Sequence, residues 1–280
     1  MQLTPRYGAD PVITIDGRPA AIAEPAIRQR RRLAEVVAGF DDAQWAHPTR
    51  CEGWTSRSVI SHLDTTNGFW VYAIAAGVRG EPSEMLAEFD PVATPAALVA
   101  ATEAETTAAV LERFLASNQA LIDQLASLDD ANWSAPAEAP PGHLSVSALV
   151  HHALWDAWIH ERDILLPMGR VPIEHNDEIV ACLRYAAALG PAFACLMGQA
   201  EGGVLVVEST DPSATVVVDI GESVAVRAGE GDEPGDLRLR GGAVGLVEAL
   251  SLRQPLDQPV PPELAWMVGG LATVFDADPV

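Results

Sequence analysis

The chain has 280 residues, which is long enough for one large domain or two smaller ones, each with its own core. Apolar residues make up 49% and charged residues 20%, a composition typical of a folded protein rather than a disordered one. Acidic residues outnumber basic ones by 39 to 17, and the resulting charge of −22 argues against nucleic acid or an anionic membrane as partner.

Helices separated by proline-rich loops are predicted for the first part of the chain. Residues 20–42 carry apolar side chains at helical spacing. Thr55 stands where an N-cap would begin a second helix, through VISHLDTTNGFWVYAIAAG. Thr94 followed by Pro95 is another start signal, and this third helix is predicted to extend as far as Leu128.

Two more helices follow after a break at Pro140-Pro141-Gly142. The fourth covers SVSALVHHALWDAWIHERDILL and stops at Pro167, and the fifth spans about 177–196. A short internal repeat supports a bundle built from two similar helical pairs, because FDDAQWAHP at 40–48 resembles LDDANWSAP at 128–136.

The pattern changes near Gly202-Gly203. VLVVES, TVVVDI, SVAVRA and DLRLR are short, β-branched segments separated by turn residues, and they predict a small, mostly antiparallel sheet. AVGLVEALSLR and PELAWMVGGLATVF predict one or two helices packed on that sheet. We therefore expect an α+β fold, with a helical domain over 1–200 and a small C-terminal domain over 201–280.

The three cysteines are too few and too widely spaced for a disulfide framework. Cys182 lies in an apolar segment and is expected in the core, whereas Cys51 is in a loop, where a nucleophilic role would require a neighbouring base. The first residues lack the layout of a signal peptide, and no apolar run reaches the roughly 18 residues needed to span a bilayer. We expect a cytoplasmic protein.

Histidines and one aspartate on the second and fourth predicted helices form a candidate metal site. Asp156 and His160 are four residues apart and share one helix face, as do His152 and Asp156, whereas His151 is turned away from that face. A third ligand must come from another helix, for which His62 is the natural candidate.

Two imidazoles and one carboxylate with an open position are typical of a catalytic zinc site or a non-haem iron site. The ligand types alone leave zinc, iron, nickel and manganese open. The segment WDAWIHERD also has an alternative interpretation, in which its charged residues form a solvated, salt-bridged face and its tryptophans serve only packing.

A longer motif matches a known family. It reads W-x-x-P-T-x-C-x-G-W-T-x-R-x-V-x-x-H-L and comprises Trp45, Pro48, Thr49, Cys51, Gly53, Trp54, Thr55, Arg57, Val59, His62 and Leu63. This segment resembles the N-terminal signature of the mycothiol-dependent maleylpyruvate isomerase family, in the DinB-like metalloenzyme superfamily. The resemblance covers roughly residues 20–195 and implies a DinB-like up-and-down helical bundle.

A second family element, Glu, three residues, His and then Asp three further on, is similar to Asp156, His160 and Asp163. Here Asp156 replaces the usual Glu, so the carboxylate arm is one methylene shorter. The resemblance implies His62, Asp156 and His160 as the metal ligands. It leaves His152, His151 and Asp163 as residues that surround the ligands or as reserve ligands.

The C-terminal region is similar to that family's smaller, sterol-carrier-like α/β domain. The pattern G-x-x-x-x-L-x-x-x-L-x-x-R corresponds to Gly242, Leu246, Leu250 and Arg253 in part of its spacing. In the family an arginine from this region reaches toward the substrate's carboxylates. The resemblance implies that role for Arg253, with a plain surface arginine as the alternative.

The resemblance implies an enzyme that uses one divalent metal ion, with zinc favoured, and mycothiol as the thiol cosubstrate. It would act on a small electrophilic substrate as a cis-trans isomerase or an S-transferase, as a monomer or homodimer. A metal-dependent hydrolase with water at the open position and a non-catalytic binding module are the alternatives.

Overall fold

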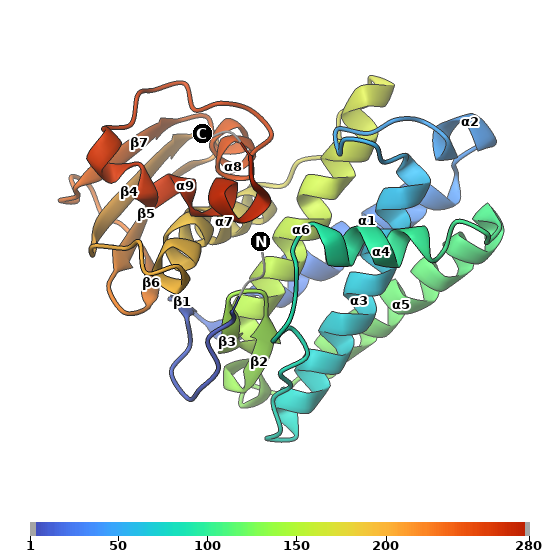
Figure 1. Ribbon diagram of the computed structural model, residues 1–280, viewed down its shortest axis with the longest axis horizontal. Helices are drawn as coiled ribbons and strands as arrows, with labels where there is room; N and C mark the ends of the chain where they lie inside the picture. Colours follow the sequence, from blue (N-terminus) through green and yellow to red (C-terminus); the bar gives the residue numbers. More distant parts are fainter. Residues whose placement is uncertain (1–3, 278–280) are drawn as a thin grey trace.

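The computed structural model describes residues 4–277, and it consists of a helical bundle beside a mixed sheet (Figure 1). The helices are α1 (Ala23–Ala38), α2 (Asp42–Trp45), α3 (Ser56–Val78), α4 (Ala93–Ala100), α5 (Thr107–Ser127), α6 (Val146–Leu165), α7 (Asn176–Leu196), α8 (Ala243–Leu250) and α9 (Trp266–Phe275). The strands are β1 (Ile13–Ile15), β2 (Pro136–Ala139), β3 (Gly142–Ser145), β4 (Gly203–Thr210), β5 (Ser213–Ile220), β6 (Val224–Ala228) and β7 (Leu237–Gly241). The predicted α+β class is confirmed.

The two helices that carry the candidate ligands begin at side-chain caps. Thr55 accepts a hydrogen bond from the backbone N–H of Ser58, whose hydroxyl in turn accepts one from the N–H of Thr55. Ser145 caps α6 by accepting from the N–H of Ala148. The caps satisfy N–H groups that lack partners inside the helix, so they fix the starts of α3 and α6 and the positions of the side chains that follow.

The third predicted helix is interrupted in the structure. The chain leaves the helical conformation after α4, and α5 starts afresh with Thr106 as its cap. The Arg57 guanidinium donates to the carbonyl oxygens of Thr102 and Glu105 in this interruption. These bonds from α3 engage carbonyls that a continuous helix would need for itself, which accounts for the break that local periodicity misses.

The break at Pro140-Pro141-Gly142 is a tight turn between β2 and β3, a hairpin that the sequence analysis did not predict. Gly142 has a φ of +130°, and a Cβ there would lie 2.0 Å from the carbonyl oxygen of Arg6. Only glycine allows the N-terminal segment to approach this closely.

The sheet has the order β1-β6-β5-β4-β7. Strand β5 pairs antiparallel with both β4 and β6, as expected for a mostly antiparallel sheet, whereas the edge strands β1 and β7 run parallel to their neighbours, so the sheet is mixed. A period-two pattern identifies strands without fixing the direction of their partners. The blue N-terminal strand β1 joins an otherwise C-terminal sheet, with Ile13 opposite Val224 (Figure 1).

Helix α7 packs against the bundle helix α6 on one side and against β5, β6, α8 and α9 on the other. Among the described residues, α7 is the one helix that is long and apolar enough to cross a membrane. However, 78% of its apolar 18-residue segment is buried, as in the core helix of a folded domain. Because β1 is an edge strand of the sheet and α7 packs on the sheet, elements from both sides of residue 200 share one core. The division at residue 200 stays a prediction, and its outer ends, 1–3 and 278–280, lie outside the described residues.

The α7–α9 contact depends on two glycines, and it gives a first testable prediction. A Cβ on Gly270 would lie 2.0 Å from the carbonyl oxygen of Gly190, which is backbone and cannot yield easily. We expect Gly270→Ala to lower the free energy of unfolding by about 1–3 kcal/mol, as overpacking does. The measurement is urea denaturation.

Gly269→Ala is the matched control on the same helix, because a Cβ there would meet nothing within 4 Å. We expect this variant to be neutral or stabilised by a few tenths of a kcal/mol, as usual for Gly to Ala in a helix. Equal stability of the two variants would show that the close α7–α9 packing is not required.

Candidate metal centre

His62, Asp156 and His160 lie together where α3 meets α6. Asp156 Oδ1 lies 3.9 Å from His62 Nε2 and 3.6 Å from His160 Nε2. One ligand atom from each of the three residues lies within 4.8 Å of the other two. The helical spacing therefore places Asp156 and His160 on one face as predicted, and α3 brings His62 to them from a distant part of the chain.

The ring of His62 is held between two aromatic neighbours. Trp54, just before the N-cap of α3, lies 5.4 Å away between ring centroids, and the His160 ring meets His62 edge-on at 5.0 Å. His62 and Asp156 keep only 12% and 13% of their side-chain surface exposed. The three polar groups are therefore largely buried, and the neighbouring rings restrict the orientation of the His62 imidazole.

Asp163 orients His160 from behind. His160 Nδ1 lies 3.0 Å from Asp163 Oδ2, on the opposite side of the ring from Asp156. When Nδ1–H donates to this carboxylate, the neutral imidazole presents the lone pair of Nε2 toward Asp156 and His62. A carboxylate behind the ring is the usual partner of a metal-binding histidine, where it sets the tautomer and makes the imidazole more basic.

The electrostatics of the cluster favour a positive charge within it. Burial alone would raise the pKa of Asp156, but His62 and His160 beside it hold that pKa well below its usual range. Burial likewise opposes charge on His160, yet Asp163, Cys51 and Asp156 raise the pKa of this imidazole to about 10. Protons and metal ions compete for such a site, because histidine ligands bind metal only when they are neutral.

One buried oxygen is a further sign that the residues fit a metal ion. Asp156 Oδ2 is sealed from solvent and has no hydrogen-bond partner among the described residues. A buried carboxylate oxygen without a partner is costly, so it needs an ion or a water to compensate it. Two imidazole nitrogens and a carboxylate are ligands that zinc and other first-row divalent ions accept.

Cys51, His160 and Asp163 form a second group of potential ligands within 4.8 Å of one another. Both oxygens of Asp163 already accept charged hydrogen bonds, from Arg50 Nε at 3.0 Å and from Arg253 Nη2 at 2.8 Å. Two guanidinium groups beside the carboxylate oppose a further cation there. The group of His62, Asp156 and His160 is therefore the better metal site.

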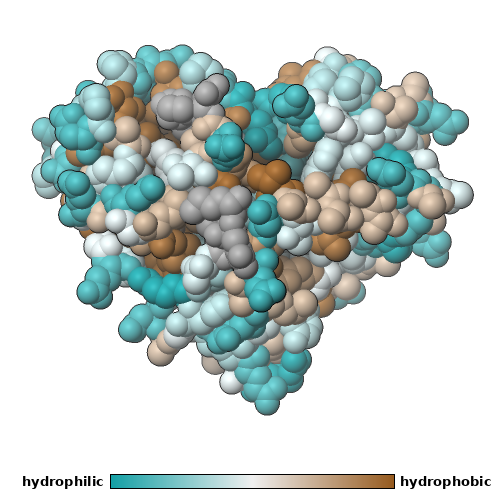
Figure 2. Space-filling view, in the orientation of Figure 1, coloured by the Kyte–Doolittle hydropathy of each residue, from teal (hydrophilic) through white to brown (hydrophobic). Residues whose placement is uncertain are grey.

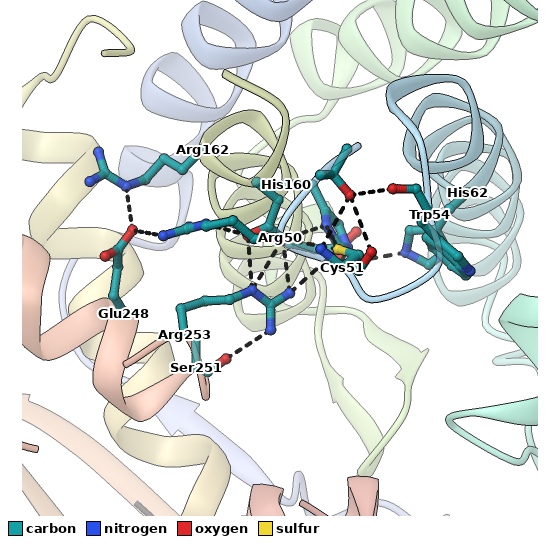
Figure 3. Close-up of polar contacts among 12 residues, drawn as sticks. Arg50, Cys51, Trp54, His62, His160, Arg162, Glu248, Ser251 and Arg253 are labelled. Atoms are coloured by element: carbon teal, nitrogen blue, oxygen red, sulfur yellow. Dashed lines mark hydrogen bonds and ion pairs between the residues drawn. The ribbon is translucent and has the colours of Figure 1, made fainter. Parts of the chain in front are cut away.

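Arg253 reaches the cluster from the loop after α8. Its Nε and Nη2 donate to Asp163 at 2.9 and 2.8 Å, and Nη2 lies 3.9 Å from Cys51 Sγ (Figure 3). The preceding residue, Leu252, has a φ of +60°, a conformation uncommon for a residue with a side chain, and the N–H of Arg253 donates to the carbonyl of Glu248. The structure thus brings Arg253 next to the candidate ligands rather than leaving it on the open surface.

Arg50 and Glu248 join the two parts of the molecule at this point, and the sequence analysis missed both. Glu248 accepts hydrogen bonds from Arg50 Nη1 at 2.9 Å and from Arg162 Nε at 2.8 Å (Figure 3). Figure 2 shows the surface notched between the C-terminal lobe and the bundle. Arg50 stands beside Cys51 within the family motif and Glu248 within the C-terminal pattern, so both lay inside segments already singled out.

Cys51 has the neighbouring groups that a nucleophilic thiol would need, although the sequence could not show them. Its Sγ lies 3.3 Å from Asp163 Oδ2 and 3.7 Å from His160 Nδ1. His160 Nδ1 and Asp163 Oδ2 also lie 3.0 Å from each other, so the thiol contacts both members of an imidazole–carboxylate pair. A nucleophilic role for Cys51 stays a hypothesis.

His151 and His152 occupy different environments on α6. His151 Nδ1 contacts the carbonyl oxygen of Ser147 in its own helix, at 2.9 Å. His152 Nδ1 lies 2.7 Å from the hydroxyl of Tyr185 on α7. Neither belongs to a group of potential ligands found among residues 4–277, and their roles as reserve ligands stay predictions.

The alternative interpretation of WDAWIHERD as a solvated face is not what the structure shows. Trp158, Glu161, Arg162 and Asp163 are all buried, with Asp163 fully enclosed. Glu161 pairs with Arg32 of α1 at 2.8 Å. The charged residues of α6 are therefore part of buried ion pairs around the site, because α6 is the central helix and is covered on several sides.

About half of the sequence matches a known family. The family model for the mycothiol maleylpyruvate isomerase N-terminal domain matches residues 27–165. No curated protein is similar enough to the chain to count as a match.

Two crystal structures share the fold, one of the mycothiol-dependent maleylpyruvate isomerase and one of a histidine-to-alanine mutant of it. Each aligns with a TM-score of 0.61 at 18% identity and covers 87% of this chain and 96% of that chain. The segment matched by the family model contains the caps of α3 and α6 and the three candidate ligands. Through residues 27–165, the chain belongs to the family of the mycothiol maleylpyruvate isomerase N-terminal domain.

Proposed function

We propose that this protein is a divalent-metal-dependent enzyme that uses mycothiol to isomerise a small electrophilic substrate. The observation that carries the proposal is the convergence of His62, Asp156 and His160 beside Arg253, with the sealed oxygen of Asp156 lacking a partner among the described residues. The family match and the fold shared with a mycothiol-dependent maleylpyruvate isomerase support the choice of thiol and reaction.

The three ligands would hold one metal ion, for which zinc is the first candidate and iron, nickel and manganese are the alternatives. Such an ion, when bound, favours the thiolate form of a thiol next to it. Asp163 keeps His160 Nε2 turned toward the site. Arg253 offers a positive charge for a substrate carboxylate and for the negative charge that develops during addition.

Isomerisation by a thiol requires no net change in atoms. The thiolate forms a C–S bond with an electron-poor double bond, whose electron pair moves to the activating carbonyl. Rotation follows about the resulting single bond. The electron pair then returns, the C–S bond breaks and the thiolate leaves, so the substrate is released as the trans isomer. An S-transferase reaction, in which the thiol stays bound and another group leaves, begins with the same addition and is the alternative reaction.

Metal removal tests the proposal directly. We expect about one zinc per chain by metal analysis, and loss of turnover on dialysis against a chelator, with recovery when zinc is added back. The assay follows maleylpyruvate with and without mycothiol, so turnover without thiol would favour the hydrolase alternative. Metal binding without consumption of any electrophile would favour the non-catalytic binding module.

A pair of variants separates the ligand from its surroundings. We expect His62→Ala to lose stoichiometric zinc and at least about 100-fold of the activity, because a two-ligand site holds the ion poorly. His175→Ala is the control, since this partly exposed histidine precedes α7 and its side chain makes no cap hydrogen bond. If His62→Ala kept its zinc and its activity, the assigned site would be wrong.

A further inference from the structure

The contact between His152 and Tyr185 has a definite direction. Tyr185 is fully buried, and His152 Nδ1 at 2.7 Å is the partner of its hydroxyl among the described residues. If Nδ1–H donated to Tyr185, the phenolic hydrogen would be sealed without an acceptor, at a cost of about 1–3 kcal/mol. The phenol therefore donates to Nδ1.

The protonation states agree with this direction. Burial raises the pKa of Tyr185 well above its usual value, so the phenol keeps its hydrogen. Burial also lowers the pKa of His152 to about 4, so the imidazole is neutral near pH 7. A neutral imidazole that accepts at Nδ1 carries its one hydrogen on Nε2.

No described residue forms a hydrogen bond with His152 Nε2. This atom is not one of the fully buried atoms without a partner, such as Asp156 Oδ2, so it keeps some exposure to solvent. His152 stands one helical turn before Asp156 on the same face of α6, and it interacts electrostatically with both Asp156 and His62. Its hydrogen is therefore available to a molecule that enters beside the candidate ligands.

Aromatic rings enclose this histidine. Trp70 of α3 meets the His152 ring edge-on at 4.8 Å, and Trp155 does so at 5.4 Å. Trp155 in turn donates to the hydroxyl of Ser251, two residues before Arg253. Only 7% of His152 is exposed, and in so buried a position a hydrogen bond that Nε2–H donates is stronger than in water.

We propose that Tyr185 fixes His152 as the Nε2–H tautomer, and that His152 is a hydrogen-bond donor to the bound substrate rather than a metal ligand. The proposal rests on the function proposed above, because the acceptor is a carbonyl or carboxylate oxygen of the electrophile at the metal site. Tyr185 is a positioning residue in this arrangement, since it acts only through His152. A fixed neutral donor suits an oxygen on which charge builds up during addition.

Nitrogen-15 NMR of histidine-labelled protein reads the tautomer without any assay of turnover. We expect the His152 signals to show a protonated Nε2 and an unprotonated Nδ1, both before and after one equivalent of zinc is added. An unprotonated Nε2, or loss of the Nε2 hydrogen on zinc binding, would overturn the proposal, because it would make His152 an acceptor or a ligand.

Tyr185→Phe supplies the functional comparison. We expect Nδ1 to become protonated in a fraction of the molecules, and kcat for maleylpyruvate with mycothiol to fall about 10-fold with little change in KM or zinc content. Tyr72→Phe is the matched control, because Tyr72 is 48% exposed on α3. An unchanged tautomer and kcat in Tyr185→Phe would refute the role of Tyr185. Absence of turnover in the wild-type protein would instead count against the proposed function, while the NMR result would still decide the tautomer.

Discussion

Asp163→Asn will weaken both the fold and the metal site. Asp163 is fully buried and accepts from Arg50 Nε, from Arg253 Nε and Nη2, and from His160 Nδ1. Asparagine keeps the shape but removes the charge that compensates two guanidinium groups. We expect the metal-free protein to lose about 3 kcal/mol of unfolding free energy, as when one partner of a buried ion pair is removed.

The same variant loses the charged acceptor that holds His160 in place, because the asparagine amide offers a single uncharged acceptor oxygen. We expect zinc affinity to fall about 10- to 100-fold, the usual effect of removing the group behind a histidine ligand. Denaturation of the metal-free protein and a zinc competition titration measure the two effects separately. Asp177→Asn is the control, because its pair with Arg28 lies at the surface, with Asp177 54% exposed, and should change stability by less than about 1 kcal/mol. Unchanged zinc affinity in Asp163→Asn would remove Asp163 from the site.

The helical part of this fold was predictable because its signals are local. Thr55 caps its helix as predicted, and a spacing of four residues is enough to place Asp156 and His160 on one face of α6. The break between α4 and α5 was not predictable in this way, because Arg57 reaches across from α3 to hold the carbonyls of the interruption.

The sheet and the outer parts of the site depend on partners far away in the sequence. Strand β1 pairs with β6 across more than two hundred residues, and no period-two pattern encodes that pairing or its parallel direction. Arg253 and Arg50 meet at Asp163 from separate loops. The family resemblance pointed to Arg253 as a site residue, because a family motif can reflect long-range contacts that helical periodicity cannot. The contacts of Arg50, Glu248 and Tyr185 can be recognised only in the folded structure.

Arg253→Met will separate recognition of the substrate's charge from support of the site. Arg253 reaches the cluster from the C-terminal region, and one of its nitrogens lies 3.9 Å from Cys51 Sγ. We expect kcat/KM for a carboxylate-bearing electrophile to fall about 10- to 100-fold, the loss of one charged hydrogen bond. The uncharged methyl ester of the same electrophile should lose far less, because it has no carboxylate for the guanidinium to bind.

Arg240→Met is the control for removing an arginine from this part of the chain, because the Arg240 side chain is 65% exposed and pairs with Glu208 away from the ligands. Asp163 keeps Arg50 and His160 as partners in Arg253→Met, so the variant should still fold and bind zinc. The comparison therefore depends on the ratio of the two substrates rather than on activity alone. Equal losses for the acid and its ester would show that Arg253 serves the fold through Asp163 and does not select the substrate.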